Sequence, residues 1–382
     1  DRTSDLALVF GQYGFSTVNT ELESAAYSHD YRINHYEIKA DNTWLSLGRH
    51  KMTFGLNGIL YDLDRGLVEP FGDNSLRFPV DLGSERGLEM AGYVADEISL
   101  SQRLTVYLGF RYSYFVHMGP AEVLVYGDGS GRRPGNVIDT LTFSSGQGVK
   151  HYGGPEPRIS LTYLMGSNNS VKISYNRVQQ YIFMLSNTIA ISPTDQWKLS
   201  DYHLRPPFVD QFSLGYYQDI PDAGLNTSAE IYYKQIKDVV DYKDGADFVN
   251  NPHTETQVLQ GEQEAYGLEF MIRKNSGKLN GWLAYSYSRS MMLFNGTLPG
   301  ENINDGLSYP SNYDRPHGLN LVTNYKVSRR LSFSGTLEYM TGRPVTYPIS
   351  IYYQNGSEYM DYSDRNQYRI PDYFRMDLSV NL

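Results

Sequence analysis

The 382-residue sequence contains no cysteine, which excludes a disulfide framework and a cysteine metal site. It also has no apolar run near the ~18 residues that a transmembrane helix requires, and its mean hydropathy is −0.46. These absences exclude a helical membrane protein. A membrane-spanning β-barrel stays possible, because its strands alternate apolar and polar residues and average to a hydrophilic sequence. The net charge of −10 argues against nucleic acid as a partner.

Tyrosine is the strongest positive signal in the composition, with 34 Tyr against 16 Phe and 3 Trp. Its apolar ring and polar tip suit β-strands and membrane interfaces. The sequence also has no linker, charge block or shift of composition that would divide it. We therefore expect residues 1–382 to form one β-barrel domain, because barrels grow in circumference and not in core thickness.

Most of the chain alternates apolar and polar residues with a period of two, which predicts β-strands. In one example Leu104, Val106, Leu108 and Phe110 interleave with polar or small residues such as Arg111. About fourteen strands are expected, many of them long enough to cross a bilayer. They lie near residues 5–16, 33–46, 50–63, 86–99, 103–117, 155–165, 170–184, 209–219, 225–243, 260–274, 279–294, 314–325, 330–346 and 371–382.

The connections between these segments alternate strictly between short and long. Short ones fall at 47–49, 100–102, 166–169, 220–224, 275–278 and 326–329, and long ones at 17–32, 64–85, 118–154, 185–208, 244–259, 295–313 and 347–370. A soluble β-sandwich has no reason to place every long loop at one end, whereas an outer-membrane barrel has short periplasmic turns and long outer loops. The pattern predicts an all-β, antiparallel, up-and-down transmembrane β-barrel in the bacterial outer membrane.

Polar motifs that could carry chemistry are weak. The glycine-rich stretch Gly127–Arg133 lacks the following helix that a phosphate-binding loop needs, so we interpret it as a flexible loop. Two acidic groups without calcium-loop spacing are interpreted as solvated loop carboxylates, with a cation site as the alternative: Asp238, Asp241, Asp244 and Asp247 in one, Asp361 and Asp364 in the other. We predict no catalytic residue, metal site or cofactor.

A further cluster of polar residues lies where a long loop enters a strand, in the run Tyr313–Gly318. An aspartate, an arginine and a histidine together suggest catalysis, but at a loop–strand junction a structural hydrogen-bond cluster is the better supported interpretation. We assign a structural role to Asp314, Arg315 and His317, and to Arg369 and Asp372 further along the chain.

Aromatic residues in the long loops are the best candidates for a ligand-binding surface, because rings with polar tips make good ligand platforms. The alternative is an interfacial girdle with ordinary loop packing. The candidate ligand-binding residues are Trp197, Tyr202, Tyr352, Tyr353, Tyr359 and Tyr362.

Four segments resemble the C-terminal half of TonB-dependent outer-membrane receptors. They are LRPPFVDQFSLGY at 204–216, AYGLE at 265–269 continuing through KNSGKLNGW at 274–282 to YSYS at 285–288, NYDRPH at 312–317 with YMTGRP at 339–344, and YRIPDYFRMDL at 368–378. Each alone is weak, but their order and spacing over the last half of the chain are specific. The first half matches by pattern only.

The resemblance implies a barrel of about 22 strands that an N-terminal plug fills, with an energy-coupling box ahead of the plug. Such receptors import iron chelates, vitamins, glycans or peptides with energy delivered through TonB. This sequence shows neither plug nor coupling box, and too few strands. We therefore expect the chain to be an internal section of a larger barrel whose first and last visible strands do not pair.

Active import is thus the leading interpretation. A passive 14-stranded pore and a receptor-like barrel that acts as a scaffold subunit remain as alternatives, and an enzyme is the least supported interpretation. Expected partners are outer-membrane lipid and the TonB system through the missing plug. A surface lipoprotein lid or other outer-membrane subunits stay open as further partners.

Overall fold

The computed structural model describes residues 2–185, 196–246, 251–298, 300–354 and 357–382, and they form an all-β fold. Fourteen long strands follow one another along the chain, each at a predicted segment, so the predicted fold class is confirmed. They are β1 (Arg2–Asn19), β2 (Tyr27–Leu47), β3 (His50–Asp64), β6 (Ser84–Ser99), β7 (Leu104–Met118), β10 (Gly148–Leu164), β11 (Asn169–Gln179), β14 (Phe208–Ile220), β15 (Leu225–Tyr242), β16 (Val258–Lys274), β17 (Leu279–Leu293), β19 (His317–Lys326), β20 (Ser332–Met340) and β25 (Tyr373–Asn381).

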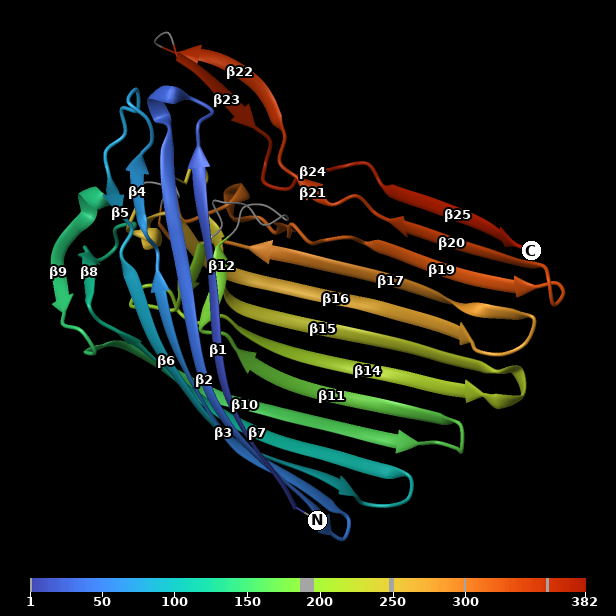
Figure 1. The fold of residues 1–382 in the computed structure, drawn as a ribbon. Helices are drawn as coiled ribbons and strands as arrows, with labels where there is room; N and C mark the ends of the chain where they lie inside the picture. The colour runs from blue at the N-terminus through green and yellow to red at the C-terminus, as the bar shows by residue number, and fades with distance from the viewer. Residues whose placement is uncertain (1, 186–195, 247–250, 299, 355–356) are drawn as a thin grey trace.

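Each long strand pairs antiparallel with the next, from β1 with β2 to β20 with β25. Figure 1 shows the result as one curved wall that runs from blue to red along the chain. In the part of the chain that the structure describes, β1 pairs only with β2, and β25 only with β20. No hydrogen-bond ladder therefore joins these two strands, as expected from the sequence.

The tight connections all lie at one end of the strands and the long connections at the other, as predicted (Figure 1). Glycines with positive φ make several of the tight turns, among them Gly48 at 70°, Gly224 at 61° and Gly277 at 94°. These backbone conformations are strained for residues with a Cβ. These glycines therefore allow the chain to reverse direction within a few residues at the tight-turn end.

The long connections carry short strands and 3-10 turns of their own. The short strands are β4 (Leu67–Pro70), β5 (Val80–Asp81), β8 (Ala121–Tyr126), β9 (Val137–Phe143), β12 (Ile182–Leu185), β13 (Gln196–Leu199), β18 (Tyr309–Pro310), β21 (Pro344–Val345), β22 (Pro348–Gln354), β23 (Ser357–Tyr362) and β24 (Tyr368–Arg369). The turns are η1 (Glu23–Ala25), η2 (Pro134–Asn136), η3 (Pro221–Ala223), η4 (Thr254–Thr256) and η5 (Asn304–Gly306). Among the described residues there is no helix with the length and hydropathy for a membrane span.

Two predicted strands are too long. The segment predicted as 170–184 ends as a wall strand at Gln179, and its last residues form β12 in the following loop. The segment predicted as 330–346 ends at Met340, and Pro344–Val345 form the separate strand β21. Both errors have one cause, because a chain that leaves the wall and stays extended keeps the same alternation.

The two faces of the wall differ in polarity as predicted. On β7, Leu108 and Phe110 are 46 % and 50 % exposed, with Leu104 and Val106 half-buried on the same face. Registers keep apolar residues opposite each other, with Leu108 facing Ile159 and Leu337 facing Met376. This apolar face does not pack into a closed core, so the soluble-sandwich alternative is excluded.

The other face of β7 carries Arg111, which lies 3.4 Å from Glu89 and 3.8 Å from Glu156 on the neighbouring strands. On β20 and β25, Glu338 faces Arg375 in the register, and the Arg375 guanidinium pairs with Asp377 at 2.8 Å. Arg111, Glu338, Arg375 and Asp377 therefore lie on the polar face.

The largest buried core lies on this inner face, at the long-loop end. Wall residues Tyr31, Leu63 and Phe115 pack there against Tyr181 and Leu199 from the loop between β11 and β14. Figure 1 places β12 of that loop inside the curve of the wall. A Cβ on Gly87 would lie 2.6 Å from the Phe115 ring and 3.1 Å from Leu199, so a glycine is needed for this close approach.

Candidate functional site

The loop between β11 and β14 is attached to the inner wall by polar contacts as well as by packing. Tyr181 stacks on Phe115 with ring centroids 4.9 Å apart, and its hydroxyl lies 2.8 Å from Ser113 Oγ. The Tyr31 hydroxyl donates a hydrogen bond to the Trp197 carbonyl at 3.1 Å. The hairpin of β12 and β13 is therefore held against the inner face of the wall at the long-loop end.

Three buried charges and the partly buried Asp201 connect this hairpin to the wall. The Lys198 ammonium lies 2.8 Å from Glu85 Oε1 and 2.5 Å from Asp201 Oδ2, and Arg65 lies 3.8 Å from Glu85. The Leu199 amide donates to Glu85 Oε2 at 3.0 Å. Buried charges of this kind are tolerated only when they are paired and hydrogen-bonded.

Ion pairing and hydrogen bonding lower the pKa of Asp201 by more than burial raises it. Burial raises the pKa of Asp201, but Lys198 and further hydrogen bonds hold it at about 2. The Asp201 carboxylate is therefore ionised at neutral pH.

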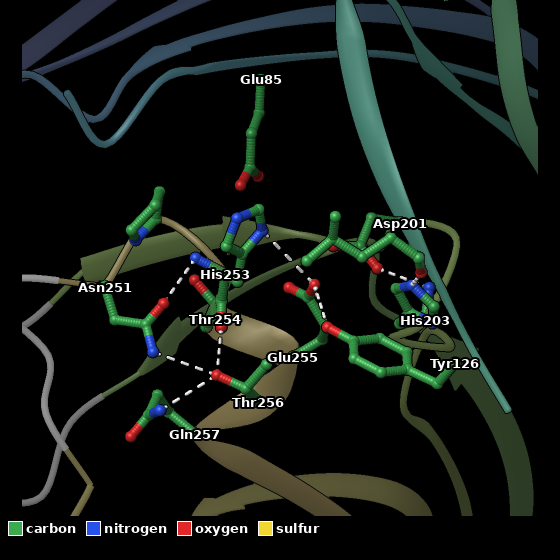
Figure 2. A network of polar contacts seen from close by, with 12 residues as sticks. Glu85, Tyr126, Asp201, His203, Asn251, His253, Thr254, Glu255, Thr256 and Gln257 are labelled. Atoms are coloured by element: carbon green, nitrogen blue, oxygen red, sulfur yellow. Dashed lines mark hydrogen bonds and ion pairs between the residues drawn. The ribbon is translucent and has the colours of Figure 1, made fainter. Parts of the chain in front are cut away.

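Another long loop, between β15 and β16, joins the same assembly through Arg65 of the loop after β3. Arg65 donates to the Pro252 carbonyl at 2.8 Å and to Thr254 Oγ1 at 2.9 Å. Figure 2 shows the continuation of this network: Glu255 accepts a hydrogen bond from the Tyr126 hydroxyl of β8 at 3.0 Å and lies 3.7 Å from His253 Nδ1. Four loops from different parts of the chain, those after β3, β7, β11 and β15, are thus held together at the long-loop end.

His203 connects the network of Figure 2 to an adjacent cavity. Its backbone amide donates to Asp201 at 2.8 Å, and its Nε2 lies 2.8 Å from the Leu124 carbonyl. The cavity measures about 450 Å³, a size that suits a small ligand. Tyr152, Tyr202 and His203 line it together with basic residues from four segments of the chain.

The structure divides the predicted aromatic residues into two groups. Tyr202 lines the cavity, and Trp197 is half-buried against the core of the inner wall. The other four lie on the hairpin of β22 and β23, which Figure 1 shows apart from the cavity loops. On this hairpin Tyr353 is 73 % exposed, and the Tyr352 and Tyr359 rings stack at 5.5 Å, whereas Tyr362 is exposed beside them.

The predicted structural residues lie at the loop–strand junction above β17, β19 and β20. Asp314 is fully buried, accepts from the Ser290 amide at 2.7 Å and binds the Arg369 guanidinium. Arg369 also donates to the Gly342 carbonyl at 2.9 Å. The chain before β25 is thereby held against the junction.

The remaining predicted residues surround this pair. Asp372 accepts from the Tyr339 hydroxyl at 2.6 Å and from the Gly342 amide at 2.9 Å. His317 Nδ1 lies 2.9 Å from the Tyr285 hydroxyl, and the Arg315 guanidinium lies 3.2 Å from the Met340 sulfur. Every member has a partner within the fold, which is what a structural cluster requires.

The first acidic group separates into ion pairs, whereas Asp361 of the second accepts a hydrogen bond from Ser350 Oγ at 3.3 Å. Asp238 pairs with Arg205 at 2.7 Å and Asp241 with Arg365 at 3.1 Å, while Asp244 also binds Arg365. Asp247 lies outside the described residues. Within the described ranges, His, Asp and Glu side chains form no group that could hold a metal ion.

Sequence reasoning missed the buried charges and the basic cavity. Glu85 and Lys198 are more than a hundred residues apart, and neither lies in a motif. Arg132 was visible only as part of the glycine-rich stretch, which leads into η2 between β8 and β9.

Comparison with known proteins identifies the class. The family described as "TonB dependent receptor-like, beta-barrel" matches residues 2–382. The chain therefore belongs to the TonB-dependent receptor family, as its sequence segments indicate, and it is an outer-membrane β-barrel protein of Gram-negative bacteria. This family comprises receptors and transporters, in agreement with the prediction that the chain is no enzyme.

Solved structures with the same fold share little sequence. The ferripyoverdine receptor of the outer membrane of Pseudomonas aeruginosa matches 99 % of this chain with TM-score 0.60 and 13 % identity, over 48 % of its own length. The ferric yersiniabactin uptake receptor of Yersinia pestis matches 100 % of the chain with TM-score 0.60 and 14 % identity, over 51 % of its length. The ferric citrate transporter matches 99 % with TM-score 0.63 and 11 % identity, again over 51 %.

The chain thus spans about half the length of the structures it matches. A search of curated proteins finds no significant match.

Proposed function

We propose that the protein that carries this chain imports a scarce nutrient across the outer membrane with energy delivered through TonB. Family membership over residues 2–382 is the observation that carries the proposal. The long loops that converge on the inner wall support it, because a receptor must bind its cargo at the outer mouth before transport. A surface lipoprotein lid over these loops belongs to the same proposal.

We further propose that the chain is one section of a larger barrel with a plug. A strand edge that faces lipid leaves backbone groups unsatisfied at a cost of several kcal/mol each. In the described part of the chain, β1 and β25 each have one such edge. Additional strands would remove both edges, and a plug would fill the inner face.

The nutrient class is open among iron chelates, vitamins, glycans and peptides. Two of the structures with the same fold are a ferripyoverdine receptor and a ferric yersiniabactin uptake receptor. Because both of these proteins bind iron chelates, iron chelates are the first compounds to test.

The test compares uptake in cells that carry the complete gene, with TonB present or deleted. Labelled iron chelates, a vitamin, a glycan and a peptide are supplied in turn. Active import predicts accumulation of at least one compound that requires both the gene and TonB. Accumulation that needs the gene but not TonB would replace import with the passive pore, and no accumulation in either strain would favour the scaffold.

A further inference from the structure

The cavity beside Tyr202 concentrates positive charge in a protein that is acidic as a whole. Four cationic side chains line it: Arg132 from the loop after β8, Lys150 from β10, Arg205 from the segment before β14 and Lys243 from the segment after β15. Glu301 is the one carboxylate among its lining residues in the described part of the chain. The net charge of the chain is −10, so its average composition does not explain this excess of cations.

Among the residues that the structure describes, most of these cations have no carboxylate partner. Within the described residues, no ion pair joins Arg132, Lys150 or Lys243 to an acid. Lys243 instead donates to the Thr256 carbonyl at 2.9 Å, and Lys150 Nζ lies 5.2 Å from the centroid of the Tyr202 ring. Arg205 pairs with Asp238 at 2.7 Å but is 66 % exposed, so its guanidinium stays accessible.

The neighbouring network shows that this arrangement is unusual within the same fold. There Lys198 has two carboxylates within ion-pair distance, and Arg65 has one. In the cavity, burial and the nearby Arg132 and Arg133 lower the pKa of Lys243, with Glu301 opposing them. Cations held close together without counter-charges repel one another, and a bound anion would remove that cost.

We propose that this cavity binds a small ligand with two or more negative charges, carried by carboxylate or phosphate groups. Arg132, Lys150 and Lys243 bind its anionic groups, and Tyr202 contacts its carbon skeleton. Arginine is suited to this role because its planar guanidinium donates two parallel hydrogen bonds to such groups. The inference rests on the proposed function, since the cavity then recognises cargo at the outer mouth.

The experiment uses the full-length receptor, purified in detergent, with isothermal titration of citrate and of inorganic pyrophosphate. The neutral triethyl ester of citrate serves as the uncharged probe. We expect at least one anion to bind and the ester not to bind. Lys150→Gln and Arg132→Gln should each weaken binding about tenfold or more, as expected for loss of a charge-assisted hydrogen bond. Binding should also weaken when salt rises from about 0.02 M to about 0.5 M.

Arg330→Gln is the matched control, because it removes the same charge from an exposed tight turn at the opposite end of the wall. It should leave binding unchanged. Heat-modified gel mobility checks that every variant is folded. The inference would be overturned if anion binding is unchanged in both Lys150→Gln and Arg132→Gln. It would also be overturned if the ester binds as strongly as the anions. Failure of both anions to bind at millimolar concentration would overturn it as well.

This result is independent of the import test. TonB-dependent uptake together with charge-independent binding would reject the anion site and leave the proposed function standing. Charge-dependent binding without TonB-dependent uptake would reject import and retain the anion site. The citrate and pyrophosphate titrations separate a preference for carboxylates from a preference for phosphates.

Discussion

At the scale of single residues, Lys198 is the cation on which the buried Glu85 and the partly buried Asp201 depend. Lys198→Met would leave Glu85 and Asp201 buried without this partner, so we expect a loss of about 3–5 kcal/mol in the stability of the loop assembly. Limited proteolysis of the full receptor measures it as earlier cleavage in the loop between β11 and β14. Lys237→Met is the matched control, because Lys237 forms an exposed pair with Glu262 at 3.7 Å. Exposed pairs contribute about 0–1 kcal/mol, and equal cleavage of the two variants would contradict the prediction.

The same residues predict how the loops respond to acid. The pKa of Asp201 falls from 3.8 to about 2 on folding, so its stabilisation is present above pH 3.8 and is lost as the pH falls toward 2. Burial lowers the pKa of His203 in the loop before β14, although its Nε2 lies 2.8 Å from the Leu124 carbonyl. A buried neutral histidine destabilises the fold once the pH falls below about 6.5, because the unfolded chain then binds the proton more readily.

We therefore expect the loops to lose protection in two steps, one below about pH 6.5 and one below about pH 4. Hydrogen exchange of the residues in β12 and β13, followed against pH, measures both steps. His203→Gln should reduce the first step and leave the second. A single step near pH 4 in the unmodified protein would mean that His203 contributes nothing.

At the scale of elements, the wall strands were predictable and the loop assembly was not. Alternation and turn chemistry place β7 and its neighbours, because both are local properties of the sequence. The end of β11 was missed since Ile182 continues the alternation after the chain has left the wall. The contact of Leu199 with Glu85 depends on two segments that meet only in the folded barrel, so no local pattern contains it.

The outward face of β7 allows a direct test of membrane contact. Leu108 is half-exposed and lies opposite Ile159 on an apolar face. Leu108→Arg should cost about 2–4 kcal/mol if it lies near the bilayer midplane, because a charge then enters lipid. Folding equilibria in lipid vesicles against urea measure this cost. Gln102→Arg places the same charge in the neighbouring tight turn and should cost little; similar values for both variants would place Leu108 outside the membrane.

Removal of the hairpin of β22 and β23 tests whether it contributes to ligand binding without contributing to the stability of the fold. In the described part of the chain, β22 pairs only with β23, and its residues are exposed. Deleting residues 348–362 should leave the melting temperature of the receptor unchanged. If Tyr352, Tyr353, Tyr359 and Tyr362 form a ligand platform, TonB-dependent uptake should fall in the same variant. Uptake that persists at the normal rate would exclude the hairpin from cargo binding.

At the scale of the whole molecule, the prediction concerns the two edges of the wall. The chain has no cysteine, so pairs introduced within it can be interpreted without interference from other thiols of the chain. Leu8→Cys with Ile38→Cys is the positive control, because these residues face each other between β1 and β2. Facing positions in paired strands lie within the distance that a disulfide spans. The test pairs combine Leu8→Cys with cysteine at Met376, Leu378 or Val380 of β25, in the complete receptor in the outer membrane.

We expect the control pair to cross-link on oxidation and every test pair to stay reduced, because further strands separate β1 from β25 in a larger barrel. The reason is energetic: an open edge in lipid leaves each unpaired backbone group at a cost of several kcal/mol, so both edges must be covered by strands. Efficient cross-linking of a test pair would show that β1 and β25 are neighbours. The wall would then close as a complete 14-stranded pore, and passive diffusion would replace active import as the function of this barrel.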